Sequence, residues 1–428
     1  MKYETHGLTR LIREDMKPAL GVTEPGAIAY AAARAREQVQ GEIRKVYVAL
    51  NSGMYKNAYT CGIPNSSRYG SLYAAALGAV AADAGKGLES LADITREDDD
   101  RASGLVDAGI VEVVLDHIGS DITIDARVET DEDRCTVRIR DSHTHIVSIE
   151  KNGVSVYEDQ EEKEQERSEG SVIHRYSLEE IWRYITEVPE EELAFIRDAF
   201  SMNLELLEEG LASDRAVMTG WLLEENGGER ISSHPLKTAQ LLCNGAIEAR
   251  VLGLCRPAMS ITGSGAHGII ATMPLYAWRQ VYKDEVDDAV LLRATALSYL
   301  ITMYIKEYSG KLSAFCGCGI AAGTGMACGL AYMRGADEQT VCTVIRNMAS
   351  GLTGMICDGG NHGCAMKGIV AVDAAFRAVD LALKGIGVAS VHGINGKTPE
   401  DTMKYMGMIA SPGMTRTEET IIEIMRQK

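Results

Sequence analysis

The stretch Ile122-Thr123-Ile124-Asp125-Ala126-Arg127-Val128-Glu129 alternates apolar and polar side chains. Successive side chains of a β-strand point to opposite faces, so this pattern predicts a strand with one buried and one solvated face. The same period of two recurs in residues 111–115, 137–139 and 147–149. We therefore expect an antiparallel meander in this part of the chain.

Helical patterns flank the predicted meander on both sides. Residues 8–36 have helical spacing that is interrupted at Pro18 and at the GVTEP motif of residues 21–25. Residues 46–50 predict a short strand, and the small residues 71–82 predict a helix. These elements place an α+β unit ahead of the rest of the chain.

A strongly charged run, EDQEEKEQERSE at residues 158–169, is too polar to bury and predicts an exposed linker. Beyond it, Ser177 and Glu180 have the spacing of a capping box, and helical patterns continue to the C-terminus. Thr415 and Glu418 repeat that spacing and predict the start of the last helix.

These patterns together predict an α+β fold built on a mainly helical body. With 428 residues, the chain exceeds the usual size of one domain. We assign residues 1–42 and 171–428 to the helical body. Residues 43–170 form an inserted α/β subdomain that contains the meander and ends in the charged linker. A site for a small ligand is expected between the two parts.

Composition limits the kinds of partner. The formal net charge of −18 disfavours nucleic acid and anionic lipid, and the N-terminal residues lack the apolar stretch of a signal peptide. We therefore expect a cytoplasmic protein whose partner is a small molecule, with no nucleic-acid or membrane partner. A homo-oligomer is compatible with the composition.

The cysteines gather in one glycine-rich region. The chain has ten, of which six lie between residues 316 and 364. In a cytoplasmic protein such thiols are buried, catalytic or bound to metal rather than paired in disulfides. Two glycine-rich turns, CGCGIAAGTG at residues 316–325 and CDGGNHGC at residues 357–364, allow another backbone or an inorganic core to approach closely.

The chain resembles the L-cysteine desulfidases of the serine dehydratase alpha-chain superfamily. The resemblance covers nearly the whole chain and is carried by GVTEP (21–25), SGMYKN (52–57), GSGAHG (263–268), KLSAFCGC (311–318) and the segment from Asn347 to Cys364. It implies a 4Fe-4S cluster on Cys318, Cys357 and Cys364, with one iron open to substrate and Cys316 as a neighbour. Buried thiols without a metal, or a structural zinc site, are the alternatives.

The resemblance implies a lyase that works without pyridoxal phosphate. Such an enzyme performs an α,β-elimination on a small β-substituted amino acid, and a cysteine-like substrate gives pyruvate, ammonia and sulfide. The family usually has a cysteine as proton acceptor where this chain has Val22. Lys56, His267 and His362 are the titratable candidates in the matched motifs, and the altered position also suggests a serine- or threonine-type dehydratase or a non-catalytic cluster-binding sensor.

The matched motifs also supply candidates for substrate binding. Backbone N–H groups of the GSGAHG loop predict an anion site for the substrate carboxylate. The GSGAHG segment could instead be only a flexible turn between helices. Thr23 and Glu24 of the GVTEP motif could merely cap the helix that begins at Pro25. His143 and His145 share one strand face, where a solvated face is expected rather than a metal site. The substrate-binding candidates are Thr23, Glu24, Ser52, Asn57, Ser264 and Gly265.

Overall fold

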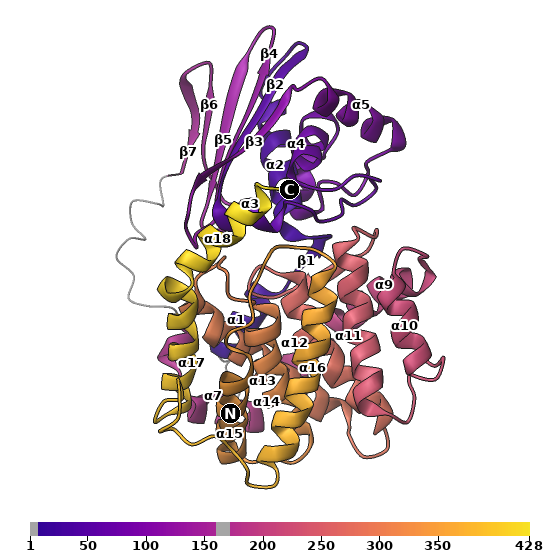
Figure 1. Ribbon diagram of the computed structural model, residues 1–428, viewed down its shortest axis with the longest axis vertical. Coiled ribbons are helices and arrows are strands. Elements are labelled where there is room, and N and C mark those ends of the chain that lie inside the picture. The colour runs from indigo at the N-terminus through magenta and orange to yellow at the C-terminus, as the bar shows by residue number, and fades with distance from the viewer. Residues whose placement is uncertain (1–6, 160–171) are drawn as a thin grey trace.

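The computed structural model describes residues 7–159 and 172–428. It divides into a sheet lobe, which runs from α2 to β7, and a helical lobe, which contains α1, β1 and the chain from residue 172 to α17 (Figure 1). The mixture of helices with a largely antiparallel sheet confirms the predicted α+β class. Most of the charged run at 158–169 lies outside the described residues.

The sheet lobe is built on a six-stranded sheet of order β3-β2-β4-β5-β6-β7. β4 to β7 pair antiparallel in chain order, which confirms the predicted meander for these strands. Residues 111–115 were expected in the same meander, but they form β3, which pairs in parallel with β2 at the sheet edge, while β2 pairs antiparallel with β4. Ile124, Ala126 and Val128 are fully buried, as the period of two requires. The strands are β2 (Ile43–Asn51), β3 (Val111–His117), β4 (Thr123–Thr130), β5 (Arg134–Arg140), β6 (Ile146–Lys151) and β7 (Val154–Glu158).

Helices pack on the buried side of this sheet. α2 is rich in alanine and lies against α4, where small side chains let two helix backbones approach. The apolar core of α2 is shared with the sheet, whereas we expected residues 1–42 to belong to the helical body. The helices of this lobe are α2 (Thr23–Arg36), α3 (Ser52–Asn57), α4 (Ser71–Val80) and α5 (Arg96–Asp107).

The helical lobe is arranged around α13 (Asp288–Ser309), which packs most extensively on α14 (Gly323–Met333). Gly325 permits this contact, because a Cβ there would lie 2.2 Å from the Ser298 carbonyl oxygen. Among the described helices, α13 alone is long and apolar enough to cross a membrane, and 78% of its apolar window is buried within the protein. It is the core helix of this lobe.

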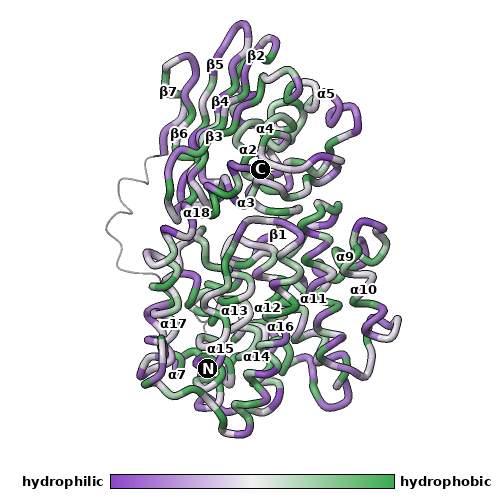
Figure 2. Tube along the Cα trace, viewed as in Figure 1, coloured by the Kyte–Doolittle hydropathy of each residue, from purple (hydrophilic) through white to green (hydrophobic). Residues whose placement is uncertain are grey.

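α12 and α17 also pack on α13, and apolar and polar residues are interspersed along the helices of this lobe (Figure 2). β1 (Lys17–Leu20) and β8 (Pro257–Ser260) form a separate antiparallel pair. The other helices of this lobe are α1 (Gly7–Asp15), α7 (Leu178–Glu187), α8 (Glu190–Leu193), α9 (Arg197–Ala212), α10 (Val217–Glu225), α11 (Pro235–Val251), α12 (Gly265–Val281), α15 (Glu338–Leu352), α16 (Gly363–Ala382) and α17 (Pro399–Met408).

The last helix, α18 (Thr415–Met425), leaves the helical lobe and packs on α3 of the sheet lobe (Figure 1). The predicted start of this helix at Thr415 is confirmed, but the predicted capping box between Thr415 and Glu418 is wrong. Met414 is the cap residue without a side-chain bond, and Glu418 is paired with Lys56 instead. The predicted capping box at Ser177 and Glu180 is present.

Candidate active site

A pocket of about 540 Å³ lies between the two lobes and is lined by residues from both. The sheet lobe contributes the start of α2, the end of α3 and the turn between β5 and β6. The helical lobe contributes the start of α12, the end of α13 and the cysteine segment. Of the predicted site residues, the pocket is lined by Glu24, Asn57, Ser264, His267, Cys318 and Cys357.

Two distant segments pair to build the cysteine side of the pocket. The Cys316 N–H donates to the Met355 carbonyl at 3.1 Å, and the Cys357 N–H donates to the Ala314 carbonyl at 2.6 Å. Cys318 then begins a π-helical turn, Cys318–Ala322, that leads into α14. Such turns are frequent at functional sites. The pairing places Cys318 and Cys357 on the wall of one pocket.

The thiols of this region act on one another electrostatically. A hydrogen bond with Cys318 lowers the pKa of Cys316 to about 7, and the same contact raises the pKa of Cys318. Cys357 and Cys364 also raise the pKa of Cys318 through their charge. Cys364 does not line the pocket; it packs on a small apolar cluster formed by Val22, Cys61 and Val251.

The donor set matches the cluster that the resemblance implies. Thiolates are the usual ligands of iron-sulfur clusters, and Lys306 and Lys367 place positive charge near Cys357. Within residues 7–159 and 172–428, no three His, Cys, Asp or Glu side chains already form a metal-binding group. The cysteines therefore fit a cluster by the chemistry of their thiolates, and not by a preformed arrangement of ligands. Cys316 is a fourth thiol in the same neighbourhood, which the spacing alone did not assign as a ligand.

The opposite wall contains the Thr262–Ser264 turn, at which the sequence predicted an anion site. Thr262 and Gly263 have φ angles of 50° and 74°, and Ser264 then caps α12. Within this left-handed turn the Ser264 N–H donates to the Ile261 carbonyl at 3.1 Å, and the Ser264 side chain makes no capping hydrogen bond. The Thr262 N–H donates to the Asp15 carboxylate at 2.5 Å. Gly265 lies beneath the turn, where a Cβ would lie 2.7 Å from Arg250 Nε.

His267 connects the anion turn to the cysteine turn. Its Nδ1 lies 2.6 Å from the Thr262 hydroxyl. Its Nε2 faces Gly317, where a Cβ would lie at 2.5 Å. Burial, with the nearby charges of Lys306 and Arg250, lowers the pKa of His267 well below its usual value, so this imidazole is neutral at pH 7.

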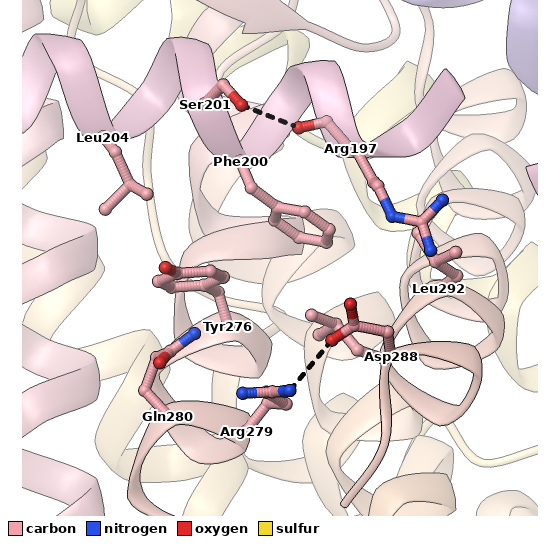
Figure 3. Close-up of a pocket in the computed structure, with 10 residues that line it drawn as sticks. Arg197, Phe200, Ser201, Leu204, Tyr276, Arg279, Gln280, Asp288 and Leu292 are labelled. Carbon is pink, nitrogen blue, oxygen red and sulfur yellow. Dashed lines mark hydrogen bonds and ion pairs between the residues drawn. The ribbon is translucent and has the colours of Figure 1, made fainter. Parts of the chain in front are cut away.

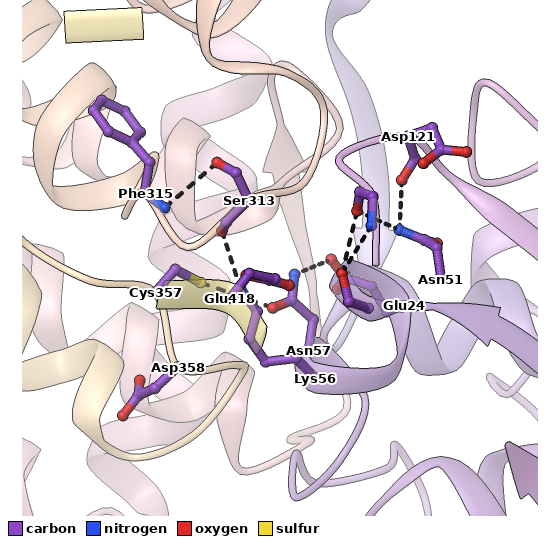
Figure 4. A network of polar contacts seen from close by, with 12 residues as sticks. Glu24, Asn51, Lys56, Asn57, Asp121, Ser313, Phe315, Cys357, Asp358 and Glu418 are labelled. Atoms are coloured by element: carbon purple, nitrogen blue, oxygen red, sulfur yellow. Dashed lines mark hydrogen bonds and ion pairs between the residues drawn. The ribbon is translucent and has the colours of Figure 1, made fainter. Parts of the chain in front are cut away.

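A polar network from the sheet lobe completes the pocket (Figure 4). Asn57 Nδ2 donates to Glu24 Oε1 at 2.8 Å, and Asn57 Oδ1 accepts from the Cys357 thiol at 3.7 Å. Thr23 lies outside the pocket wall, where its hydroxyl accepts from Arg250 at 3.2 Å. Asn57 therefore connects the Glu24 carboxylate to the cysteine wall.

Three further predicted residues lie away from the pocket. Lys56 is buried and its ammonium is paired with Glu418 Oε2 at 2.7 Å and with the Ser313 carbonyl at 3.0 Å (Figure 4). Ser52 is also buried and donates to the Gly119 carbonyl at 3.3 Å. His362 is exposed at the start of α16. None of these three side chains lines the pocket.

His143 is the main residue that the sequence interpretation missed. We expected His143 and His145 on a solvated strand face, but both lie beyond the end of β5, and only His145 is near the surface. The His143 side chain is 7% exposed and lines the pocket. The alternation of β5 carries no information about the turn that follows, because the turn breaks the period of two.

A second pocket, of about 330 Å³, lies between α9, α12 and α13 on the helical lobe (Figure 3). Its charged groups are already paired: Arg279 contacts Asp288 at 3.1 Å, and Arg197 contacts Glu190. It contains none of the predicted site residues. The pocket between the lobes is therefore the better candidate for chemistry.

Known proteins resemble the chain over nearly all of its length. The serine dehydratase alpha chain family matches residues 150–423. A "UPF0597 protein" of Clostridium botulinum strain Langeland is 40% identical over 424 residues, which is 98% of each chain. A "UPF0597 protein" of Caldanaerobacter subterraneus subsp. tengcongensis is 36% identical, again over 98% of each chain. The chain belongs to the serine dehydratase alpha chain family.

Proposed function

We propose that the protein is a lyase of amino-acid catabolism that performs α,β-elimination on a small β-substituted amino acid without pyridoxal phosphate. The observation that carries the proposal is the pocket between the lobes, which is lined by the turn before α12, by buried titratable groups and by two thiols. A cysteine-like substrate would give pyruvate, ammonia and sulfide.

The cofactor we propose is a 4Fe-4S cluster on Cys318, Cys357 and Cys364. When bound, such a cluster supplies Lewis-acid character that stabilises negative charge on substrate oxygen and on the leaving group. The positive charge of Lys306 lies near Cys318 and Cys357 and would offset the charge of their thiolates. Its ammonium is held by the carbonyls of Gly310 and Lys311 at 3.0 and 3.2 Å.

The chain's own residues would bind and orient the amino acid. The Gly263 N–H and the Ser264 hydroxyl would receive the carboxylate, because the Thr262 and Ser264 N–H groups already donate to Asp15 and to the Ile261 carbonyl. Asp15 places negative charge in the same pocket for the ammonium group. These contacts would hold the Cα–H bond between the two walls.

A serine- or threonine-type dehydratase is the second candidate. Val22, which stands where the family usually has its cysteine, is 3% exposed and packs with Cys61 and Val251 rather than lining the pocket. An altered group at this position is compatible with an altered leaving group. Elimination from serine or threonine uses the same binding contacts and releases water in place of sulfide.

Anaerobic reconstitution with iron and sulfide, followed by assays on cysteine, serine and threonine, tests the proposal. We expect bound iron and sulfide, and a 2-oxo acid with equal ammonia from at least one substrate. A loaded cluster without product would indicate a sensor, and bound zinc without iron would indicate a zinc-stabilised binding module. Either result would overturn the lyase proposal.

A further inference from the structure

His143 occupies an unusual position for a surface turn. It follows β5 and Asp141, whose φ of 64° turns the chain back toward the lobe interface. The imidazole is thereby carried into the pocket, where it is 7% exposed. Within the described chain, its Nε2 is buried and has no hydrogen-bond partner. A buried polar atom without a partner costs free energy, so its retention in a pocket suggests that a ligand or reaction uses it.

The groups around His143 suit a proton acceptor. Glu24 Oε1 lies 3.9 Å from Nε2, and Asn57 holds this carboxylate oxygen at 2.8 Å. On the other side, the ring lies over Gly263 of the anion turn, where a Cβ would be 3.4 Å from Cε1. His143 therefore sits between a fixed carboxylate and the place proposed for the substrate carboxylate.

His143 is neutral before it reacts. Burial lowers its pKa, the Glu24 charge partly opposes this, and the Arg250 and Lys311 charges lower it further. A neutral imidazole can accept a proton at neutral pH. Proton gain would create an imidazolium beside the Glu24 carboxylate, which stabilises that charge at short range.

Several other titratable groups of the pocket already have hydrogen-bond partners. Lys306 donates to two carbonyl oxygens, and Asp15 accepts the Thr262 N–H. His267 contacts the Thr262 hydroxyl through Nδ1, and its Nε2 lies against Gly317. Lys56, which we considered from sequence, is paired with Glu418 outside the pocket. Among these groups, the free ring nitrogen belongs to His143.

We propose that His143 is the catalytic base that removes the substrate α-proton, and that Glu24 is its positioning residue. The proton passes from Cα to Nε2 of His143. The electron pair of the Cα–H bond forms the Cα–Cβ double bond, and the bond from Cβ to the leaving group breaks with its pair on that group. The aminoacrylate tautomerises to an imine, and water releases the 2-oxo acid and ammonia. This inference rests on the proposed lyase function.

His143→Gln and His145→Gln make a matched pair for testing this role. His145 lies two positions away and contacts Asp159 at 2.6 Å near the surface, outside the pocket. We expect H143Q to lower kcat by about 10² to 10⁴, the usual contribution of a general base, with little change in KM. H145Q should retain wild-type kcat. Recovered substrate should gain solvent deuterium at Cα with wild type and H145Q but not with H143Q.

The outcomes separate the two proposals. Wild-type kcat in H143Q would overturn the role of His143 while leaving the lyase function intact. Failure of the reconstituted wild type on every substrate would overturn both. If H143Q fails to fold, H143A with added imidazole replaces it: restored turnover supports the role, and full activity without imidazole contradicts it. Glu24→Gln should lower kcat less than H143Q does, because it acts through His143.

Discussion

Asp15 shows how burial in the pocket changes the chemistry of one residue. Burial raises its pKa from 3.8 to about 6, although the Thr262 N–H partly opposes that change. The folded protein therefore holds this proton more tightly than the unfolded chain does. The resulting stabilisation is full at pH values below about 4 and is lost as pH rises to about 6, above which the buried charge is unfavourable.

Replacing Asp15 with asparagine tests this dependence. Asparagine keeps an oxygen for the Thr262 N–H but cannot ionise. We expect Asp15→Asn to raise the melting temperature relative to wild type at pH 7, with the difference disappearing near pH 4. Thermal unfolding across this range measures it. A difference that does not change with pH would show that Asp15 acts by packing rather than by charge.

The pairing of α3 with α18 depends on one buried ion pair. Lys56 and Glu418 have side chains that are 0% and 5% exposed, and their charged atoms lie 2.7 Å apart. Removing one partner leaves a buried charge uncompensated, which typically costs about 3–5 kcal/mol. We expect Glu418→Ala to lower the free energy of unfolding by about that amount.

The neighbouring Glu419 provides a control on the same helix. It pairs with Arg416, whose side chain is 79% exposed, and such surface pairs contribute little to stability because water screens the charges. Urea unfolding of E418A and E419A should therefore separate the two positions. The double variant K56M/E418L should recover much of the loss, because no charge remains buried. Equal effects of E418A and E419A would contradict this account of how α18 is held.

At the scale of the whole molecule, the active-site pocket joins the two lobes. A ligand that binds only the folded protein stabilises it by about 2.7 kcal/mol at one hundred times its dissociation constant. We expect the substrate of the reconstituted enzyme to slow amide hydrogen exchange in both lobes, at the turn of residues 141–143 and at residues 262–267. Propylamine, which lacks the carboxylate, serves as the control. Protection in one lobe only would place the ligand outside this pocket.

Local patterns predicted much of the fold because they depend on neighbours in the chain. The alternation at residues 122–129 predicted a half-buried strand, and the Ser177 box predicted a helix start. Both rest on interactions within a few residues. The resemblance likewise selected Cys318 and Cys357, which the structure brings to one pocket wall, although the cluster itself stays a prediction.

The sequence by itself determined the α+β class, the meander and the family, because periodicity and motifs are properties of short segments. Only the tertiary structure decided which titratable groups face the pocket. Lys56 of α3 forms an ion pair with Glu418 of α18, and His143 lies beside Glu24 of α2. Their roles depend on contacts between residues far apart in the chain, and no local spacing records which side chains such packing buries, pairs or leaves free.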